Sequence, residues 1–556
     1  MTRLSSGSYN TALGYAALAF NTTASNNTAV GYQAGYSNTT AGSITAVGHS
    51  ALFSNTTGDA NTAVGRNSLY ANTTGGQNAA VGLQTLYSNT TGSYNTGLGR
   101  EALFSNTTAS DNTAVGYQAA YSNTTGVRNT AIGRGAGYSL TTGNYNVAMG
   151  YLAMYSTTTP DDNVAIGTNA LYSNTGNSGN VAIGRNALYS PNGAGEQVAV
   201  GIYALEASTT GSTNVAVGGR ALRNNTTGSY NTAQGYQALQ ANTTASNNTA
   251  VGYQAGYTNT TGQYGTYVGY RAGYSSNATY GNTCFGYRAG DSSSSGGGNT
   301  LIGGVGSVGQ DPAGINLTTG NNNSFIGTGA GSQISTGSKN VILGSFNGNQ
   351  GGLDIRTASN YIVLSDGDGN PRGIFDGSGN FLIGKTAIGN TTTGWQLLSN
   401  GFGTAVVTIS TTNQAFVWNN TSTAGTASIE FRANDVAKGS ISWNNTNTTY
   451  NTTSDYRLKH DIAPITGALA KVAALKPVTY KWDADNSDGE GFIAHELAEV
   501  CPFAVTGKKD AVDAEGKPIY QGIDTSFLVA TLTAAIQELK SELDSVKAEL
   551  ATLKGN

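Results

Sequence analysis

Residues 27–40 read Asn-Thr-Ala-Val-Gly-Tyr-Gln-Ala-Gly-Tyr-Ser-Asn-Thr-Thr, and close variants of this stretch recur every 17 residues along most of the chain. The first glycine of the stretch belongs to a row that runs from Gly14 to Gly303 without a slip. One interval then lengthens to 24 residues, and the next, which ends at Gly344, returns to 17. A strict period this short is typical of stacked coils that bury their apolar faces against their neighbours. Residues 1–344 are therefore predicted to form a rod.

The composition limits the class of protein. Of 556 residues, 78 are Gly and only 10% are charged, which argues against ordinary globular packing. The net charge of −4 offers no electrostatic basis for binding nucleic acid or an anionic membrane. No apolar run approaches the roughly 20 residues of a membrane span. The first residues lack the apolar centre of a signal peptide and read as the tail of a repeat, so either the rod begins abruptly or an upstream anchoring domain is missing.

The two cysteines predict no disulfide framework, because Cys284 and Cys501 lie in different segments. Cys284 occupies a repeat position that is usually Ala. We therefore expect it to be a small buried core residue.

Each repeat predicts two short strands and two turns. Before the register glycine stand Thr or Val, then usually Ala, then an apolar residue, and this alternation is typical of a strand. Three residues after the glycine comes Ala, then Leu or Gly, and often Tyr or Phe, which we interpret as a second strand ending in the turn Asn-Thr-Thr-Gly. The predicted fold is mainly β, a parallel β-roll or β-solenoid. About 20 coils at the usual ~4.8 Å strand spacing would make a shaft about 95 Å long.

Polar and aromatic residues recur at fixed places in the repeat. Asn opens most strands, and stacking would align these residues into a ladder of hydrogen-bonded amides. The Asn-x-Thr triplets, formally glycosylation acceptors, are interpreted as turn residues. We expect the residues after the register glycine to cover neighbouring coils as amphipathic surface, with stacking on sugars as the alternative. Because these residues would interrupt a flat array of Thr, we do not expect the rod to bind ice. They are chiefly Tyr15, Tyr32, Tyr117, Tyr151, Tyr236, Tyr253, Tyr270, Tyr287, Arg66, Arg100, Arg134 and Arg185.

The repeat core is expected to consist mostly of Ala, Val and Thr, which would leave one small-residue apolar face of a single stack uncovered. Association into a homotrimer would cover that face. Asn-Val-Ala-Ile-Gly at 163–167 and 180–184 resembles the head repeat of trimeric autotransporter adhesins, which implies a trimeric left-handed β-roll. Those repeats are typically shorter than 17 residues, so the second turn must be longer here.

Residues 304–399 depart from the simple repeat. The lengthened interval contains Gln-Asp-Pro-Ala-Gly at 310–314, which predicts a loop that leaves the shaft. Residues 345–399 are predicted to be a β-hairpin transition, with turns that begin at Asp366 and Asp376. The first turn is similar to the opening of a calcium loop but lacks the required Gly and bidentate Glu, so we predict no metal site there.

Residues 400–453 are predicted to form a small distal β domain. Tryptophans gather around it, whereas the repeats contain none, so the segment is a candidate for contact with a partner. Core packing in a small sandwich is the alternative. The tryptophans are Trp395, Trp418 and Trp443, and the alternating runs lie at 405–410, 415–418 and 428–432.

Residues 454–556 are predicted to be a different, α+β unit, because charged residues become frequent after Thr453. We expect a helix over 465–475, a strand over 478–483, a strand or helix entry at Gly491 and a coiled coil over 525–554. The coiled coil has an apolar seam with alternating spacings of three and four residues. The seam consists of Val529, Leu532, Ile536, Leu539, Leu543, Val546, Leu550 and Leu553.

The junction carries a second resemblance. Ser454-Asp-Tyr-Arg-Leu-Lys-His-Asp-Ile462 resembles the opening of the endosialidase-type intramolecular chaperone, as do Ala-Leu-Lys-Pro-Val-Thr-Tyr (474–480), Gly-Phe-Ile-Ala-His-Glu-Leu (491–497) and Ala-Val-Thr-Gly (504–507). This family ends phage tail fibres and tailspikes, and it also occurs in a eukaryotic membrane-bound transcription factor. The resemblance implies a self-cleaving chaperone over 454–556, which trimerises the β-structured chains upstream and then cuts itself off.

The resemblance also implies the catalytic residues. The family's Ser and Lys fall on Ser454 and Lys459, and the cleavage site on the bond between Ser454 and Asp455. A serine hydroxyl needs a base, and a lysine serves as one only when burial lowers its pKa, which folding and trimerisation would supply. His495 and Glu496 lie in a signature stretch and are not expected to be catalytic. No turnover enzyme is expected, only single-turnover serine-type autoproteolysis, with no cofactor and no metal.

These inferences predict a homotrimeric phage or phage-like tail fibre for host attachment, made in the host cytoplasm and placed in the virion tail. Its expected partners are a host cell-surface glycan or protein and other tail or baseplate proteins, with no nucleic acid and no membrane insertion. One alternative is a bacterial surface adhesin of trimeric-autotransporter type, which would need an export signal and an anchor. Another is a polysaccharide-degrading tailspike, which needs paired carboxylates in a groove, whereas the acidic residues of the shaft are scattered.

Overall fold

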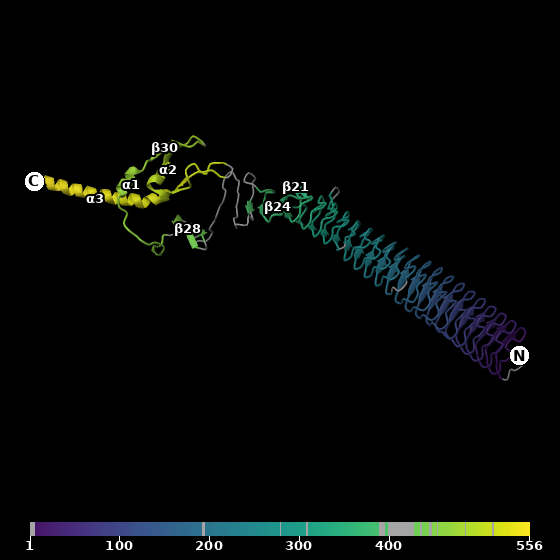
Figure 1. Cartoon of the computed structure of the whole chain (residues 1–556). Coiled ribbons are helices and arrows are strands. Elements are labelled where there is room, and N and C mark those ends of the chain that lie inside the picture. Colours follow the sequence, from purple (N-terminus) through teal and green to yellow (C-terminus); the bar gives the residue numbers. More distant parts are fainter. Residues whose placement is uncertain are drawn as a thin grey trace. The chain divides into compact units, whose positions relative to one another are not determined.

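The computed structural model describes residues 6–191, 195–278, 280–306, 310–388, 395–397, 427–433, 436–443, 447–452, 454–483, 485–513 and 516–555. The chain divides into two compact units, Met1–Val417 and Trp418–Asn556. The first unit contains a long stack of coils, and the second contains short helices and strands and a long terminal helix (Figure 1).

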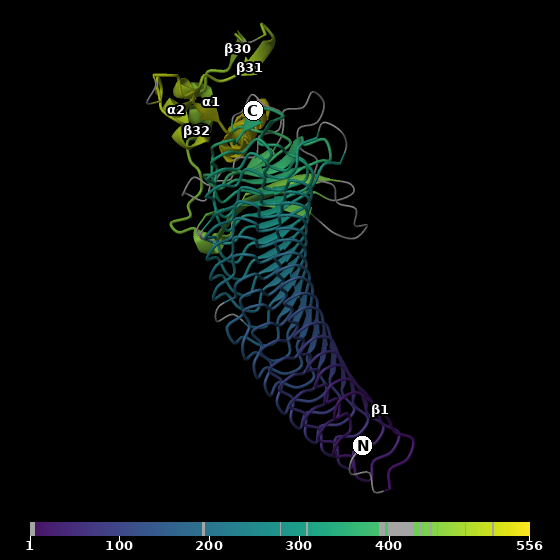
Figure 2. The ribbon, with the colours of Figure 1, turned by 90° about the vertical axis from the view of Figure 1, so that its right-hand side faces the viewer.

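One strand of three residues per coil builds the shaft. Each strand pairs in parallel with the same three positions of the next coil, as where Ala114 lies opposite Ala131. The strands follow one another along one side of the stack (Figure 2), which confirms the predicted parallel β-solenoid. They are β1 Thr11–Leu13, β2 Thr28–Val30, β3 Thr45–Val47, β4 Thr62–Val64, β5 Ala79–Val81, β6 Thr96–Leu98, β7 Thr113–Val115, β8 Thr130–Ile132, β9 Val147–Met149, β10 Val164–Ile166, β11 Val181–Ile183, β12 Val198–Val200, β13 Val215–Val217, β14 Thr232–Gln234, β15 Thr249–Val251, β16 Thr266–Val268, β17 Thr283–Phe285, β18 Thr300–Ile302, β19 Ser324–Ile326 and β20 Val341–Leu343.

The prediction of a second strand in each repeat was wrong. In the described coils the segment after the register glycine is a run of turns. Its residues two and four places after the glycine have left-handed backbone, as at Gln118 (φ 55°) and Ala120 (φ 48°). This conformation costs an L-residue roughly 1–2 kcal/mol. Here, however, the N–H of Gln118 donates to the carbonyl of Arg100 at 3.0 Å, and the N–H of Ala120 donates to the carbonyl of Ala136 at 2.8 Å. The turn is therefore hydrogen-bonded to the coil before it and to the coil after it. In some repeats a glycine stands four places after the register glycine, as at Gly35, and this glycine was the signal of the turn in the sequence.

Ala and Leu, rather than Val and Thr, fill the interior of the coils. The middle residue of each strand points inward, so that Ala114 is buried while its neighbours Thr113 and Val115 are only partly buried. In a later coil, Ala170 and Leu171 are 0% exposed within a single chain. Burying a leucine side chain stabilises a fold by about 1.5–3 kcal/mol. The small-residue core is therefore covered without a partner, and the homotrimer stays a prediction.

Two columns of buried asparagine run along the stack. The first opens the strands, as predicted: the Asn95 Nδ2 donates to the Asn78 Oδ1 at 3.1 Å and to the Ala109 carbonyl at 2.8 Å. The second comes from the Asn-Thr-Thr turns, where the Asn89 Nδ2 donates to the Asn72 Oδ1 at 2.7 Å. These amides give hydrogen-bond partners to backbone groups inside the coil. The second column extends the predicted turn role of these asparagines to the packing between coils.

Substituting Asn95 by Ala is expected to destabilise the shaft by roughly 2–4 kcal/mol. The Asn112 N–H, which donates to the Asn95 Oδ1 at 3.0 Å, and the Ala109 carbonyl would each lose a partner inside the coil. Denaturant unfolding of the full chain, followed by circular dichroism, measures the loss. Asn224→Ala, at an exposed position, is the control and is expected to change stability by at most about 0.5 kcal/mol. Equal losses in the two variants would contradict a role for the ladder.

Aromatic side chains form stacked columns on the surface. One column is a continuous run of rings from Tyr36 to Tyr189, with neighbouring centroids 4.9–5.5 Å apart. In the row that follows the register glycine, the rings from Tyr236 to Tyr287 stack at 5.1–5.7 Å. In the same row the Arg134 guanidinium lies 5.8 and 5.7 Å from the two tyrosine rings beside it. The rows therefore cover neighbouring coils, as predicted.

The lengthened interval leaves the stack in register, because β18 pairs with β19 as any two neighbouring strands do. Ala313 is fully buried, and its N–H donates to the carbonyl of Gly303 at 3.1 Å. Gly314 has the left-handed backbone of the ordinary coil. The end of the predicted loop at 310–314 has therefore already returned to the shaft, and the extra residues precede it.

The sheet continues beyond Gly344. Strand β20 pairs in parallel with β23 (Ile362–Ser365). Three antiparallel pairings then follow in sequence order, which join β23 to β24 (Pro371–Phe375), β24 to β25 (Phe381–Ile383) and β25 to β26 (Trp395–Leu397). This confirms the predicted hairpins at Asp366 and Asp376. Hydrogen bonds to Asp366 from the Asn370 backbone N–H and from the Arg372 guanidinium lower the pKa of its carboxyl to about 2. The strands are β21 Asn349–Gln350, β22 Leu353–Asp354, β23 Ile362–Ser365, β24 Pro371–Phe375, β25 Phe381–Ile383 and β26 Trp395–Leu397.

The second unit contains a three-stranded antiparallel sheet and the C-terminal fold. In the sheet, β28 (Val436–Trp443) lies between β27 (Ala427–Ala433) and β29 (Thr448–Thr452). The predicted runs at 405–410 and 415–418 and Trp418 lie outside the described residues. The C-terminal fold follows the sheet in the chain. Its elements are η1 Tyr456–Leu458, α1 Ala468–Ala474, β30 Val478–Lys481, β31 Asp488–Gly491, α2 Ala494–Val500, η2 Pro502–Ala504, β32 Val505–Thr506, β33 Gly522–Ile523, η3 Thr525–Phe527 and α3 Leu528–Lys554.

Cys284 is fully buried at an alanine position, as predicted, and burial raises the pKa of its thiol to about 12. In the full chain with Cys501→Ala, it is expected to resist iodoacetamide at about pH 8, because the thiolate is the reactive form and the folded shaft excludes the reagent. Alkylation followed by mass spectrometry along a denaturant series measures this. Complete labelling is expected only after the shaft unfolds, and labelling of the native protein would contradict the packing.

Candidate self-cleavage site

A short 3-10 turn shapes the junction between the β-structured segments and the C-terminal fold. The Asp455 carboxylate caps this turn and accepts hydrogen bonds from the Arg457 backbone N–H at 2.8 Å and from its guanidinium at 2.9 and 2.7 Å. These bonds, that of the guanidinium first, lower the pKa of Asp455. The Lys459 N–H closes the turn by donating to the Tyr456 carbonyl at 3.0 Å. The pair of Asp455 and Arg457 was not predicted from the sequence, although a capping Asp followed two residues later by Arg was its signal.

The turn brings together the two residues predicted to be catalytic. The Lys459 Nζ lies 2.6 Å from the Ser454 Oγ and is hydrogen-bonded to it. A nucleophile and its base must lie within about 2.6–3.2 Å of one another. The bond predicted to be cleaved, between Ser454 and Asp455, adjoins this pair. The arrangement is therefore suited to removal of the serine proton by a neutral lysine.

In a single chain this site is open to solvent. Ser454 and Lys459 are both exposed. A lysine becomes an effective base when it is desolvated, because burial disfavours its charged form. Large apolar side chains near the pair are exposed too: Tyr456 by 75%, Leu458 by 66% and Ile462 by 73%. The junction of a single chain therefore leaves apolar surface in contact with solvent.

The fold behind the junction has a small core. Leu497 of α2 and Cys501, which caps this helix, are buried together with Ala504 and Leu528. The carboxylate of Glu538, on α3, accepts hydrogen bonds from the backbone N–H groups of Ala468 at 3.0 Å and Leu469 at 2.7 Å, and so ties α1 to α3. His495 and Glu496 lie partly buried on α2, and among the described residues no hydrogen bond or ion pair joins either of them to Ser454 or Lys459.

Helix α3 leaves its apolar seam exposed. It spans Leu528–Lys554, close to the predicted 525–554, and follows the short turn η3. Each seam residue is at least 41% exposed, which is unusual for so many large apolar side chains in one row. They are Val529, Leu532, Ile536, Leu539, Leu543, Val546, Leu550 and Leu553.

The described part of the chain holds no group of three or more His, Cys, Asp or Glu residues placed to bind a metal ion. Within the same residues, no helix combines the length and the apolar character that crossing a membrane requires.

Residues 454–506 match the family described as the chaperone of endosialidase. The match begins at Ser454 and includes Lys459, α1 and α2, whereas α3 lies beyond it. This segment and the solenoid shaft of 17-residue coils fit a tail-fibre or tailspike-like protein that carries an intramolecular chaperone. The comparisons with curated proteins and with solved structures found no match.

Proposed function

We propose that this chain forms a homotrimeric phage or phage-like tail fibre, which attaches to the host surface after its chaperone has cut itself off. The observation that carries the proposal is the hydrogen bond between Ser454 and Lys459, located at the first residue of the matched chaperone segment. A self-cleaving chaperone at that place separates the finished fibre from the unit that assembled it. The fibre is then held together kinetically, because the unit that folded it has left.

The exposed seam of α3 supports the trimer. An apolar seam with heptad spacing is buried when helices associate. In a single chain, Leu539 and Leu543 are 52% and 46% exposed, and Phe503 and Tyr520 elsewhere in the chaperone are 60% and 86% exposed. Three chains that share one coiled coil would bury the seam, and their junctions would then lie close to one another.

Chemistry constrains how the serine acts. The Lys459 Nζ takes the proton of the Ser454 Oγ, and the oxygen attacks a carbonyl carbon. The peptide C–N bond then breaks as the lysine gives this proton to the leaving amine, and water hydrolyses the ester that remains. Attack on the carbonyl of its own residue would close a four-membered ring. Cleavage between Ser454 and Asp455 therefore requires the same hydroxyl of a neighbouring chain, whereas attack on the preceding carbonyl would cut one bond earlier. A trimer brings such hydroxyls together and shields the lysine.

The attachment role follows from the shaft. Its stacked coils and aromatic columns make a stiff, repetitive surface that suits contact with a host glycan or protein. In this proposal the mature fibre is part of the virion tail, is made in the host cytoplasm and is fixed to other tail or baseplate proteins.

The experiment measures the mass of the assembled protein in solution and its adsorption to bacterial cells. The full chain is expected to sediment as a trimer, and the labelled fibre to adsorb to cells of its host within a panel of strains without releasing sugar. Leu539→Ser, on the seam, is expected to lower the yield of trimer several-fold, while Glu542→Ser, at an exposed position of the same helix, leaves it unchanged. A monomeric wild type would overturn the trimer, and release of oligosaccharide would favour a tailspike.

A further inference from the structure

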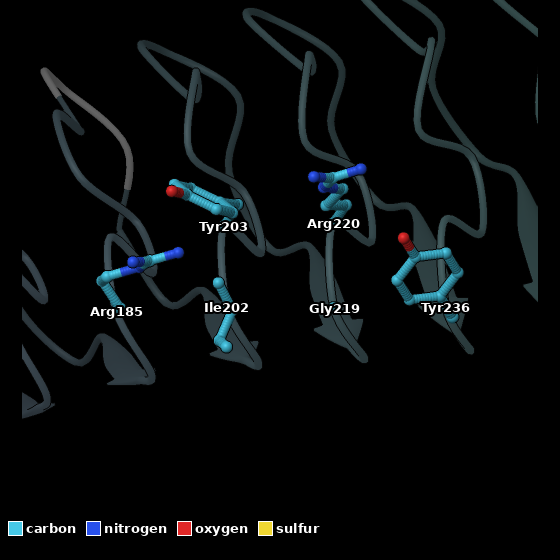
Figure 3. A pocket seen from close by; sticks show the side chains of 6 residues that line it. All are labelled: Arg185, Ile202, Tyr203, Gly219, Arg220 and Tyr236. Carbon is cyan, nitrogen blue, oxygen red and sulfur yellow. The ribbon is translucent and has the colours of Figure 1, made fainter.

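The row of side chains that follows the register glycine contains a stack of four tyrosine rings, and Gly219 stands in the coil before the first of them. From Tyr236 to Tyr287 each coil contributes a tyrosine to this row, and the rings stack on one another. In the two coils before Tyr236 the same position holds Gly219 and Ile202, so the stack ends there (Figure 3). A hollow of about 460 Å³ opens at this point, lined by Arg185, Ile202, Tyr203, Gly219, Arg220 and Tyr236.

The hollow offers an apolar platform at the end of a stack. Tyr236 stacks on Tyr253 at 5.7 Å between ring centroids, and the position on its other side belongs to Gly219, which has no side chain. Ile202 forms the next position of the row and is 50% exposed, and Tyr236 is 45% exposed. A saturated six-membered ring that presents axial C–H groups on one face would bury this apolar surface as the missing ring of the column would.

The hollow is also positively charged. The Arg185 guanidinium lies 4.9 Å from the centroid of the Tyr203 ring, and Arg220 stands beside Gly219 in the same coil (Figure 3). Arg223, on the other side of Tyr203, is paired with Glu206 at 2.6 Å. Within the described residues, no carboxylate lies within ion-pair distance of Arg185 or Arg220. A guanidinium binds a carboxylate through two parallel hydrogen bonds, so these two groups favour an anionic ligand.

We propose that this hollow, the Gly219 slot, binds a carboxylated sugar residue of a surface polysaccharide. The sugar ring stacks on Tyr236 over Gly219, and its carboxylate pairs with Arg220 and Arg185. The proposal rests on the host-attachment function proposed above, and it names the ligand class and one place on the shaft where attachment occurs. Each chain of a fibre carries one slot, so a polymer that reaches several slots binds by avidity.

The variants that test the slot use residues that the repeat itself carries at the same positions, so the fold should tolerate them. Gly219→Tyr places a ring where each of the four following coils has one and fills the slot. A Cβ there would lie 3.3 Å from the flexible Tyr236 ring, and Gly219 has no left-handed backbone to strain. Arg220→Gln introduces the residue found at Gln237 and Gln254. Arg66→Tyr is the matched control, because it removes one charge from the same row far from the slot.

Calorimetric titration of the assembled full chain with oligogalacturonate, oligomannuronate and hyaluronan oligosaccharides measures binding, with the methyl ester of oligogalacturonate as the uncharged probe. At least one acidic probe is expected to bind. Its affinity should fall at least tenfold with Arg220→Gln, be lost with Gly219→Tyr and stay unchanged with Arg66→Tyr, and the ester should bind at least tenfold more weakly than its acid. The slot proposal is overturned if no acidic probe binds, if Gly219→Tyr binds as well as wild type, or if that variant changes the assembly instead.

The failure of the slot differs from the failure of attachment. If the wild type and Gly219→Tyr adsorb equally to cells, attachment stands and the sugar is bound elsewhere or a protein is the receptor, which overturns the slot. If the wild type binds an acidic oligosaccharide with the expected pattern of variants but adsorbs to no strain, the slot stands and the attachment function fails.

Discussion

Replacing Ser454 by Ala is expected to leave the chain whole, whereas the unmodified chain is expected to separate after assembly into residues 1–454 and 455–556. The structure places the Ser454 Oγ 2.6 Å from the Lys459 Nζ, and the variant removes this hydroxyl, which is the proposed nucleophile. Loss of a serine nucleophile lowers peptide cleavage by a factor on the order of 10⁶. Intact-mass spectrometry of the purified protein, taken at intervals after expression, measures both products.

Three further variants separate catalysis from folding. Ser454→Cys keeps a nucleophile and is expected to cleave, more slowly than wild type. Lys459→Gln removes the base and is expected to slow cleavage by roughly 10²–10⁴-fold, while Lys508→Gln, exposed and beyond the matched segment, cleaves as wild type does.

The masses also decide the route of attack. A product that begins at Asp455 supports attack by a neighbouring chain, and a product that begins at Ser454 means that the preceding carbonyl was attacked. A wild-type chain that is trimeric and stays whole would contradict self-processing, and the chaperone would then be an uncleaved trimerisation clamp.

Replacing Gly133 by Ala is expected to destabilise the shaft by roughly 3–5 kcal/mol, among the largest effects for a single methyl group. Gly133 belongs to the register row and has φ +128°, a region that L-residues rarely adopt. A Cβ there would lie 2.5 Å from the carbonyl oxygen of Gly150 in the next coil. Because backbone rather than a flexible side chain is hit, the two coils must separate or the chain must change conformation. Denaturant unfolding of the full chain measures the loss.

Gly176 provides the matched control for that substitution. Its φ is +138°, close to that of Gly133, but the nearest atom to an added Cβ is 3.9 Å away. Gly176→Ala therefore carries the conformational strain without the clash and is expected to cost about 1–3 kcal/mol. Equal losses in the two variants would mean that close stacking of the coils contributes nothing to the requirement for glycine.

The period of the repeat was enough to predict the parallel solenoid, the burial of Cys284 at an alanine position and the first asparagine ladder. In stacked coils each residue contacts its equivalent one period away, so a pattern along the chain is already a pattern of contacts. The separate C-terminal unit and the apolar seam of α3 were likewise predicted from the sequence, because composition and heptad spacing are local properties of the chain.

Only the tertiary structure showed the features that depend on contacts among several coils or among residues of a folded turn. The second segment reads as a strand, yet its N–H groups bond to coils on both sides, and this makes left-handed turns at Gln118 and Ala120 tolerable. Tyr267 fills an alanine position because Gly273 and Gly256 leave room for its ring. The slot over Gly219 forms where the stack of tyrosine rings ends. The contact of Ser454 with Lys459 depends on a turn that the short sequence between them does not specify. Such features depend on the volume and direction of side chains that converge in space, which a pattern of residue types along one dimension does not contain.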